Sequence, residues 1–266
     1  MRVKCFGNVL LASVFVPVLA AAAQREPPVQ KELVERFGEW ADNYTASLPS
    51  YTALETVRQT RFGRRGNPSD ERAATYDYTF QRAAEGSGAF DESRAPAAAG
   101  ENGDKPSGRL RDESSIGLFS KAALLVTRFA TRYHARMKYF FVPEHPDAVS
   151  EFVVVGYRQT SGEGLMEVDG KLVFPGGRAW IDPNDGKIIR LEEEFGNLGK
   201  TRYFISVDFA VVSELARHNV ASELARHNDQ PATGAWLPAR VTVRIFDKDR
   251  LELQNEYTYS AFRHLN

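Results

Sequence analysis

The sequence WIDPNDGKIIRLEEEF at residues 180–195 decides the fold. It has the pattern of a strand, a tight turn with Pro183 and Gly186, and a second strand. Asp182, Asn184 and Asp185 resemble the start of a calcium loop, but Gly186 comes one position too early for that loop. The stretch therefore predicts a β-turn that joins two antiparallel strands.

Similar strand patterns occur on both sides of this hairpin. Residues 74–81 and 203–211 alternate apolar with mostly polar side chains, which predicts strands with one buried face. Asp169-Gly170, between residues 165–168 and 172–174, predicts a tight hairpin turn. Further strands are predicted at residues 51–62, 137–142, 151–158, 236–246 and 251–259. Together these segments predict a meandering antiparallel sheet.

Two amphipathic helices are predicted to cover this sheet. Between residues 29 and 48, apolar side chains spaced by three or four form one stripe, and Pro28 and Pro49 favour its two ends. A second helix is predicted at residues 116–133 by a similar stripe. Strands with one apolar face need such a cover. The residues thus predict an α+β protein.

Two segments interrupt the pattern. Residues 93–115 hold one large aliphatic side chain, Leu110, and predict a flexible loop, with a lid over a cavity as the alternative. The sequence SELARHN occurs at residues 213–219 and again at 222–228. Nine residues of helix turn through about 900°, so the two copies would face opposite sides. A local duplication in an exposed connection is predicted.

The N-terminus has the order of a secretory signal peptide: Arg2 and Lys4, an apolar core, then small residues up to Ala23. The core is shorter than the ~20 residues that span a bilayer. Cleavage near Ala23 would remove residues 1–23 and leave a single domain at 24–266, without Cys5, the one cysteine. We therefore expect a periplasmic or secreted protein with no transmembrane segment in the mature chain.

Charge and motifs exclude several classes of function. Lys and Arg total 34 against 35 Asp and Glu, with no basic stripe, so nucleic acid is not an expected partner. His218 and His227 fall in the duplication and would point apart, so no metal or cofactor is predicted. Glu192 and Glu194 share one strand face and are predicted to be solvated. No catalytic residue is predicted.

The arrangement as a whole resembles a known fold. The motifs that carry the resemblance are the helix ending in Leu48-Pro49, the hairpin at 180–195, WLPA at 236–239 and YTYSAFR at 257–263. They resemble the periplasmic lipoprotein-sorting fold of the LolA and LolB type, and more closely a group of exported bacterial proteins of unknown function that share it. The resemblance implies a strongly curved, unclosed antiparallel sheet, or half-barrel, whose concave apolar face is covered by helices. Carriers with that fold hold acyl chains in this space.

These observations predict a non-enzymatic protein that binds a lipid, an acyl chain or another hydrophobic ligand in the concave face of the sheet. The alternative is an envelope interaction or sensing module with a solid core, a protein partner and no small-molecule ligand. The predicted ligand lining consists of one-sided strand residues: Tyr76, Tyr78, Phe80, Ile181, Ile189, Leu191, Tyr203, Ile205, Val207, Val243 and Ile245.

Overall fold

The computed structural model describes residues 29–83, 89–97, 110, 121–142, 151–168, 171–198, 201–212 and 234–265. The predicted signal peptide and both SELARHN copies lie outside the described residues. The elements in chain order are α1 (Lys31–Ser47), β1 (Tyr51–Phe62), β2 (Pro68–Arg82), β3 (Phe90–Pro96), the 3₁₀ helices η1 (Ala122–Phe129) and η2 (Thr131–Arg136), β4 (Met137–Phe141), β5 (Val153–Gln159), β6 (Met166–Val168), β7 (Lys171–Val173), β8 (Gly176–Ile181), β9 (Ile188–Leu198), β10 (Thr201–Val212), β11 (Ala235–Asp247) and β12 (Arg250–His264).

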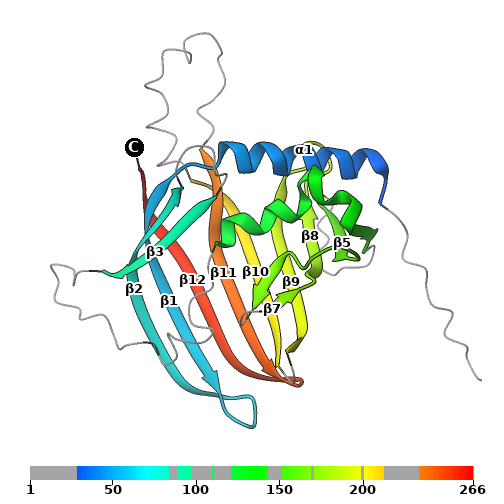
Figure 1. The fold of residues 1–266 in the computed structure, drawn as a ribbon. Helices are drawn as coiled ribbons and strands as arrows, with labels where there is room; N and C mark the ends of the chain where they lie inside the picture. The colour runs from blue at the N-terminus through cyan, green and yellow to red at the C-terminus, as the bar shows by residue number, and fades with distance from the viewer. Residues whose placement is uncertain are drawn as a thin grey trace, which may run out of the picture.

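Ten strands form one antiparallel sheet in the order β3-β2-β1-β12-β11-β10-β9-β8-β5-β4 (Figure 1). Strands β3 and β4 are the two edges, so the sheet is open. The hairpin of β6 and β7 forms a separate two-stranded sheet, and β5 therefore pairs with β8. The predicted α+β class and the predicted antiparallel sheet are confirmed.

The hairpin at residues 180–195 consists of β8, a turn and β9. In the turn, the Asp182 carboxylate accepts a hydrogen bond from the Asn184 backbone N–H at 2.8 Å, and the Asp185 carboxylate accepts one from the Lys187 N–H at 2.9 Å. Gly186 has a φ of 75°, which suits glycine. Both carboxylates accept hydrogen bonds from N–H groups within the segment, and Asp182 and Gly186 close it, so this segment is a turn, as predicted.

The strands bury one face of the sheet. In β1, buried Tyr51, Ala53, Glu55, Val57 and Gln59 alternate with less buried neighbours. We call this buried side the inner face. It also carries other buried residues: Tyr78, Leu191, Val207, Val243 and Tyr257.

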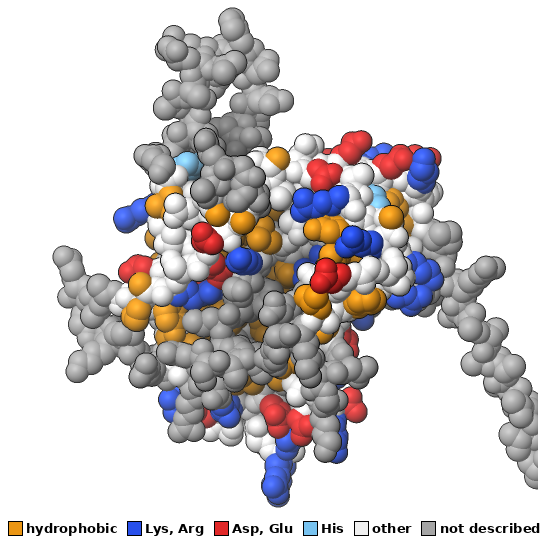
Figure 2. Space-filling model, viewed as in Figure 1, with side chains coloured by type: hydrophobic (Ala, Val, Ile, Leu, Met, Phe, Trp, Pro, Cys, Tyr) orange, Lys and Arg blue, Asp and Glu red, His pale blue; other side chains and the backbone are white. Residues whose placement is uncertain are grey.

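Helices α1 and η1 pack on the inner face. Phe37 of α1 contacts Phe129 of η1 with 5.5 Å between ring centroids, and Tyr44 of α1 contacts Phe209 of β10 at 6.3 Å. Figure 1 shows both helices crossing the strands near one end, while the β1–β2 and β11–β12 hairpins extend well past them. In Figure 2, charged side chains gather along α1 and hydrophobic side chains appear below it. The helices therefore lie over one end of the strands.

The second predicted helix, at 116–133, is corrected by the structure. Its described part is two 3₁₀ helices, η1 and η2, separated at Ala130, whose ψ of 141° is extended. The buried side chains of Ala123, Val126 and Phe129 recur every three residues. This spacing fits the three residues per turn of a 3₁₀ helix. Two short helices therefore replace one long α-helix.

The predicted loop at 93–115 overlaps β3. The strand pairs with β2 along its whole length, from Tyr76↔Pro96 to Arg82↔Phe90, so residues 93–96 are edge-strand residues. Of the remaining loop residues, 98–109 and 111–115 lie outside the described residues. The sequence concealed β3 because two of its inward side chains, Glu92 and Arg94, are charged.

Candidate functional site

The structure brings ten of the eleven predicted lining residues together on the inner face. They belong to one cluster of buried side chains that also includes residues of α1 and η1. These ten residues are Tyr76, Tyr78, Phe80, Ile181, Leu191, Tyr203, Ile205, Val207, Val243 and Ile245. The inner face is therefore a continuous apolar surface that crosses β2, β11, β10, β9 and β8.

Ile189 is the exception. Ile188, and not Ile189, pairs with Ile181 and is fully buried, because the β8–β9 register shifts between Trp180 and Ile181. Ile189 is partly exposed and lies outside the buried cluster. Ile188 therefore takes the buried position on the inner face that the alternation assigned to Ile189.

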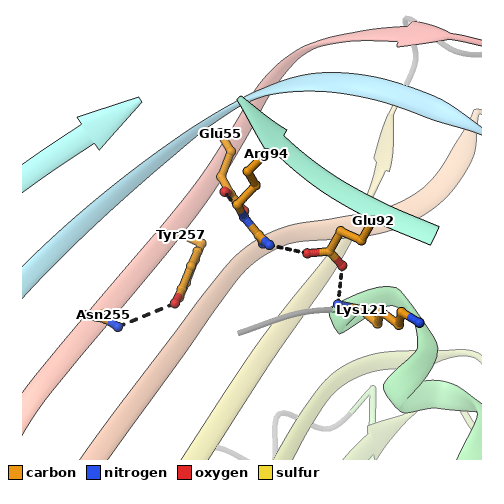
Figure 3. Close-up of polar contacts among 6 residues, drawn as sticks. All are labelled: Glu55, Glu92, Arg94, Lys121, Asn255 and Tyr257. Atoms are coloured by element: carbon orange, nitrogen blue, oxygen red, sulfur yellow. Dashed lines mark hydrogen bonds and ion pairs between the residues drawn. The ribbon is translucent and has the colours of Figure 1, made fainter. Parts of the chain in front are cut away.

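A charged group lies within this apolar surface (Figure 3). Arg94 of β3 donates two hydrogen bonds to the Glu55 carboxylate of β1, from Nε at 2.5 Å and from Nη2 at 2.9 Å. It also forms an ion pair with Glu92 of β3. The side chains of Glu55, Glu92 and Arg94 are 0%, 3% and 10% exposed. Arg94 is thus buried between two carboxylates.

Strand geometry explains how these side chains meet. Arg94 is paired in register with Tyr78 of β2, and its guanidinium lies 5.1 Å from the Tyr78 ring centroid. The side chain thereby passes over β2 and reaches Glu55 on the next strand. Burial opposes the charged form of Arg94, but the hydrogen bonds to Glu55 and the charge of Glu92 outweigh it and raise the Arg94 pKa.

Glu92 also links the sheet edge to the cover. Its Oε2 accepts a hydrogen bond from the backbone N–H of Lys121, the residue before η1, which has a φ of 58°. Burial raises the pKa of the Glu92 carboxyl, while Arg94 and the Lys121 N–H act in the opposite direction. One carboxylate therefore connects β3 to the start of η1.

A second charged group lies at the other end of η1. Arg128 of η1 pairs with Glu193 of β9 at 2.9 Å, and the Tyr157 hydroxyl of β5 donates to the same Glu193 oxygen, Oε1, at 3.0 Å. Glu193 is fully buried, and burial raises its pKa, opposed by Arg128 and Tyr157. The other oxygen, Oε2, is buried without a hydrogen-bond partner. It is an available acceptor on the inner face.

Uncharged polar groups lie between β1 and β12. Gln59 and Asn255 are paired in register and almost fully buried. Asn255 Nδ2 donates to the Tyr257 hydroxyl at 3.5 Å, as Figure 3 shows. The Gln59 amide nitrogen is buried without a hydrogen-bond partner, so it is an available donor. The inner face thus combines apolar surface with a few polar atoms.

Sequence reasoning missed these polar groups. Glu55 lies between Ala53 and Val57 in the buried alternation of β1, and Glu193 lies between Leu191 and Phe195 in that of β9. The period of two that identified the strands could have placed both carboxylates on the inner face. The arginines could not have been assigned as partners, because they come from distant segments.

A pocket of about 370 Å³ lies outside the predicted lining, between the C-terminal half of α1 and the start of β11. Its walls include Trp40 and Tyr44, whose rings stack at 5.3 Å, and Trp236. The Trp236 indole nitrogen donates to the Ile188 carbonyl at 3.0 Å, which fixes this wall. The other lining residues are Asn43, Ser47, Leu48, Pro49, Gly234 and Ala235.

Within the described part of the chain, no group of three or more His, Cys, Asp or Glu side chains is placed to hold a metal ion. None of the described helices is long and apolar enough to cross a membrane. His134 belongs to η2, and its Nε2 is 2.8 Å from the carbonyl oxygen of Phe129, the last residue of η1. His145, His218 and His227 lie outside the described residues.

The structure is similar to two solved structures. One is a LolA superfamily protein from Nitrosomonas europaea, with 10% sequence identity, a TM-score of 0.41, and coverage of 88% of this chain and 94% of that chain. The other is a DUF1329 family protein from Desulfovibrio piger, with 13% identity, a TM-score of 0.34, and coverage of 90% and 93%. The first has the superfamily name that the sequence motifs suggested. No family model and no curated protein matches the sequence. At these identities and TM-scores, neither similarity indicates a ligand or an activity.

Proposed function

We propose that this chain is an exported, non-enzymatic binding protein that holds a lipid, an acyl chain or another hydrophobic ligand against the inner face of its sheet. In this proposal the sheet acts as a strongly curved half-barrel, and α1 and η1 form its cover. The ten buried residues of the predicted lining, together with Ile188, contact the apolar part of the ligand.

One observation carries the proposal: the apolar inner face extends past its helical cover. Phe195, Tyr203 and Ile245 lie on the inner face toward the hairpin ends of their strands, whereas α1 and η1 cross the opposite end (Figure 1). An extended apolar surface with a few placed polar groups is typical of sites for hydrophobic ligands.

Export is part of the proposal. The leader predicted at residues 1–23 would direct the chain to the periplasm or out of the cell, and residues 24–266 would fold as one domain. The composition agrees with this assignment, because the only cysteine precedes the predicted cleavage site.

Native mass spectrometry of the protein, purified without detergent, tests the proposal. We expect a bound mass of a few hundred daltons or more that is lost on unfolding, together with an increase in Tm when palmitate or 1-monopalmitoylglycerol is added. A bare polypeptide with no change in Tm would contradict the proposal.

A second function, an interaction module with a solid core, is favoured by two exposed side chains. Leu172 and Phe174, at and beside β7, are each 51% exposed. Exposed apolar side chains on a surface hairpin can contact a protein partner. In that case, the double variant L172S/F174S would lose cross-linking to its partner in envelope extracts but keep its Tm. Bound lipid that survives this double variant would favour the first function.

A further inference from the structure

The charged side chains buried on the inner face are already paired with one another, with one carboxylate in excess. Arg94 is held between the carboxylates of Glu55 and Glu92, and Arg128 is paired with Glu193. These two arginines therefore face three carboxylates. A ligand with an acidic head group would find both guanidinium groups already in ion pairs with carboxylates, although Arg128 Nε makes no hydrogen bond.

Two of the buried polar atoms without a hydrogen-bond partner are suited to an uncharged ligand group. Glu193 Oε2 can accept a hydrogen bond, and Gln59 Nε2 can donate one. Both residues are at least 98% buried, Glu193 at 0% exposed and Gln59 at 2%. Buried polar atoms without partners are unfavourable, so a ligand hydroxyl or ester group that pairs with either atom would gain free energy.

We propose that the inner face selects amphiphiles with an uncharged, hydroxyl-bearing head group over those with an acidic head group. This inference rests on the proposed function and names the ligand class of the same site. An ionised ligand carboxylate on this face would lose its hydration close to the protein's own buried carboxylates and would find no unpaired counter-ion. A glycerol head group carries no charge, so its loss of hydration would cost less free energy, and its hydroxyl could donate a hydrogen bond to Glu193.

The experiment uses two probes with the same acyl chain, palmitate and 1-monopalmitoylglycerol. The full mature chain is incubated at pH 8 with an equimolar mixture of both, and native mass spectrometry gives the ratio of the two complexes. At this pH palmitate is ionised, and an alkaline pH favours the ionised forms of Glu92 and Glu193, whose pKa values burial raises. We expect the monoglyceride complex to exceed the palmitate complex by about tenfold or more, the factor for leaving one buried polar group unpaired.

The variant Glu193→Gln locates the selection. It removes the carboxylate that neutralises Arg128, so the guanidinium becomes available to an acidic head group. We expect the ratio of monoglyceride complex to palmitate complex to fall by about tenfold or more. Such a fall is a gain in palmitate binding, which loss of packing alone would not produce. Arg128→Gln should move the ratio in the opposite direction.

Glu194→Gln is the matched control. Glu194 is the next residue of β9, but its side chain is 49% exposed and pairs with Arg202 on the opposite face of the sheet. The substitution changes the net charge equally and should leave the ratio unchanged.

The outcomes separate the two proposals. Binding of neither probe would contradict the proposed function and this inference with it. Binding of both with a ratio near one, or with palmitate preferred, would overturn this inference alone. The wild-type ratio decides the matter even if Glu193→Gln fails to fold, and circular dichroism checks the fold of each variant. A Glu193→Gln ratio equal to that of the wild type would overturn the role of the Arg128–Glu193 pair.

Discussion

Gly186 lies directly against the backbone of Arg36: a Cβ atom at position 186 would be 2.7 Å from the Arg36 carbonyl oxygen. The Arg36 guanidinium in turn donates to the Pro183 carbonyl oxygen. The turn of the 180–195 hairpin therefore docks on α1, and the absence of a side chain at position 186 permits this contact. The local hairpin thus also positions the helical cover.

Gly186→Ala should destabilise the protein for two reasons, a clash with α1 and a φ of 75°. We expect a loss of about 2–3 kcal/mol in the free energy of unfolding, measured with urea. Gly66→Ala is the control, because Gly66 has a φ of 79° but nothing within 4 Å of an added Cβ. It should cost about 1 kcal/mol from backbone strain alone. Equal losses in both variants would refute the close packing of the turn on α1.

Arg94→Met should strongly destabilise the fold, because it leaves the fully buried Glu55 without its two hydrogen bonds. Removing one partner of a buried ion pair costs about 3–5 kcal/mol. The double variant E55Q/R94M should recover part of this loss in a urea-unfolding mutant cycle. Arg58→Met breaks an exposed pair with Glu71 and should cost at most about 1 kcal/mol. A loss for Arg94→Met as small as that for Arg58→Met would mean that the buried pair is not formed.

The contribution of Glu92 to stability should fall as the pH rises, whereas the contribution of a carboxylate in an exposed salt bridge rises with pH. Burial raises the pKa of Glu92 in the folded protein above the ordinary glutamate value of 4.5. Its contribution to stability is therefore complete below its unfolded-state pKa and is lost as the pH rises through the folded-state pKa.

The measurement compares unfolding free energies of the wild type and Glu92→Gln between about pH 4 and pH 8. Because glutamine does not titrate, the wild-type value minus the variant value should decrease as the pH rises. Asp91→Asn, an exposed position on the same strand, controls for removal of one charge. An increase of the difference with pH would show that Arg94 and Lys121 outweigh burial.

Ala74→Phe tests whether the inner face accommodates a ligand. Ala74 is buried on the inner face opposite Val57, whereas its neighbour Ala73 points to the other side of β2. If a ligand occupies the inner face, the phenylalanine ring should reduce its occupancy in native mass spectra and leave Tm nearly unchanged. In a solid core, the same substitution should cost about 1–3 kcal/mol through overpacking and change no bound mass. Ala73→Phe should change neither the ligand occupancy nor the stability of the protein.

Much of the fold could be predicted because its strands are strongly one-sided. The boundaries of β1 match the predicted 51–62, and the apolar positions of β2 face inward as predicted. In β10 the prediction holds from Tyr203 to Phe209, but beyond a register shift at Asp208/Phe209 Val211 is exposed and Val212 is buried. Those assignments depend on local alternation, which a sequence displays directly.

The errors arise where distant contacts override the local pattern. Ile189 follows the alternation, but the register shift in the β8–β9 pair gives its buried place to Ile188. The charged strand β3 had the composition of a loop, because Glu55, which neutralises Arg94, is 39 residues away in sequence. Likewise, Arg128 and Glu193 belong to segments that the chain order does not connect. Pairings of this kind depend on tertiary structure and are not visible in periodicity.

The position of β12 has a consequence for how the chain acquires its structure. The three strands β1, β2 and β3 are joined to the rest of the sheet only through β12, which pairs with β1 on one side and β11 on the other. Residues separated by about two hundred positions, such as Tyr51 and His264, must meet before the sheet is continuous. Such long-range pairing is entropically slow. During synthesis, therefore, the two parts of the sheet cannot join until β12 has been made. If the chain is exported as proposed, this delay would keep it unfolded long enough to be threaded through a secretion channel.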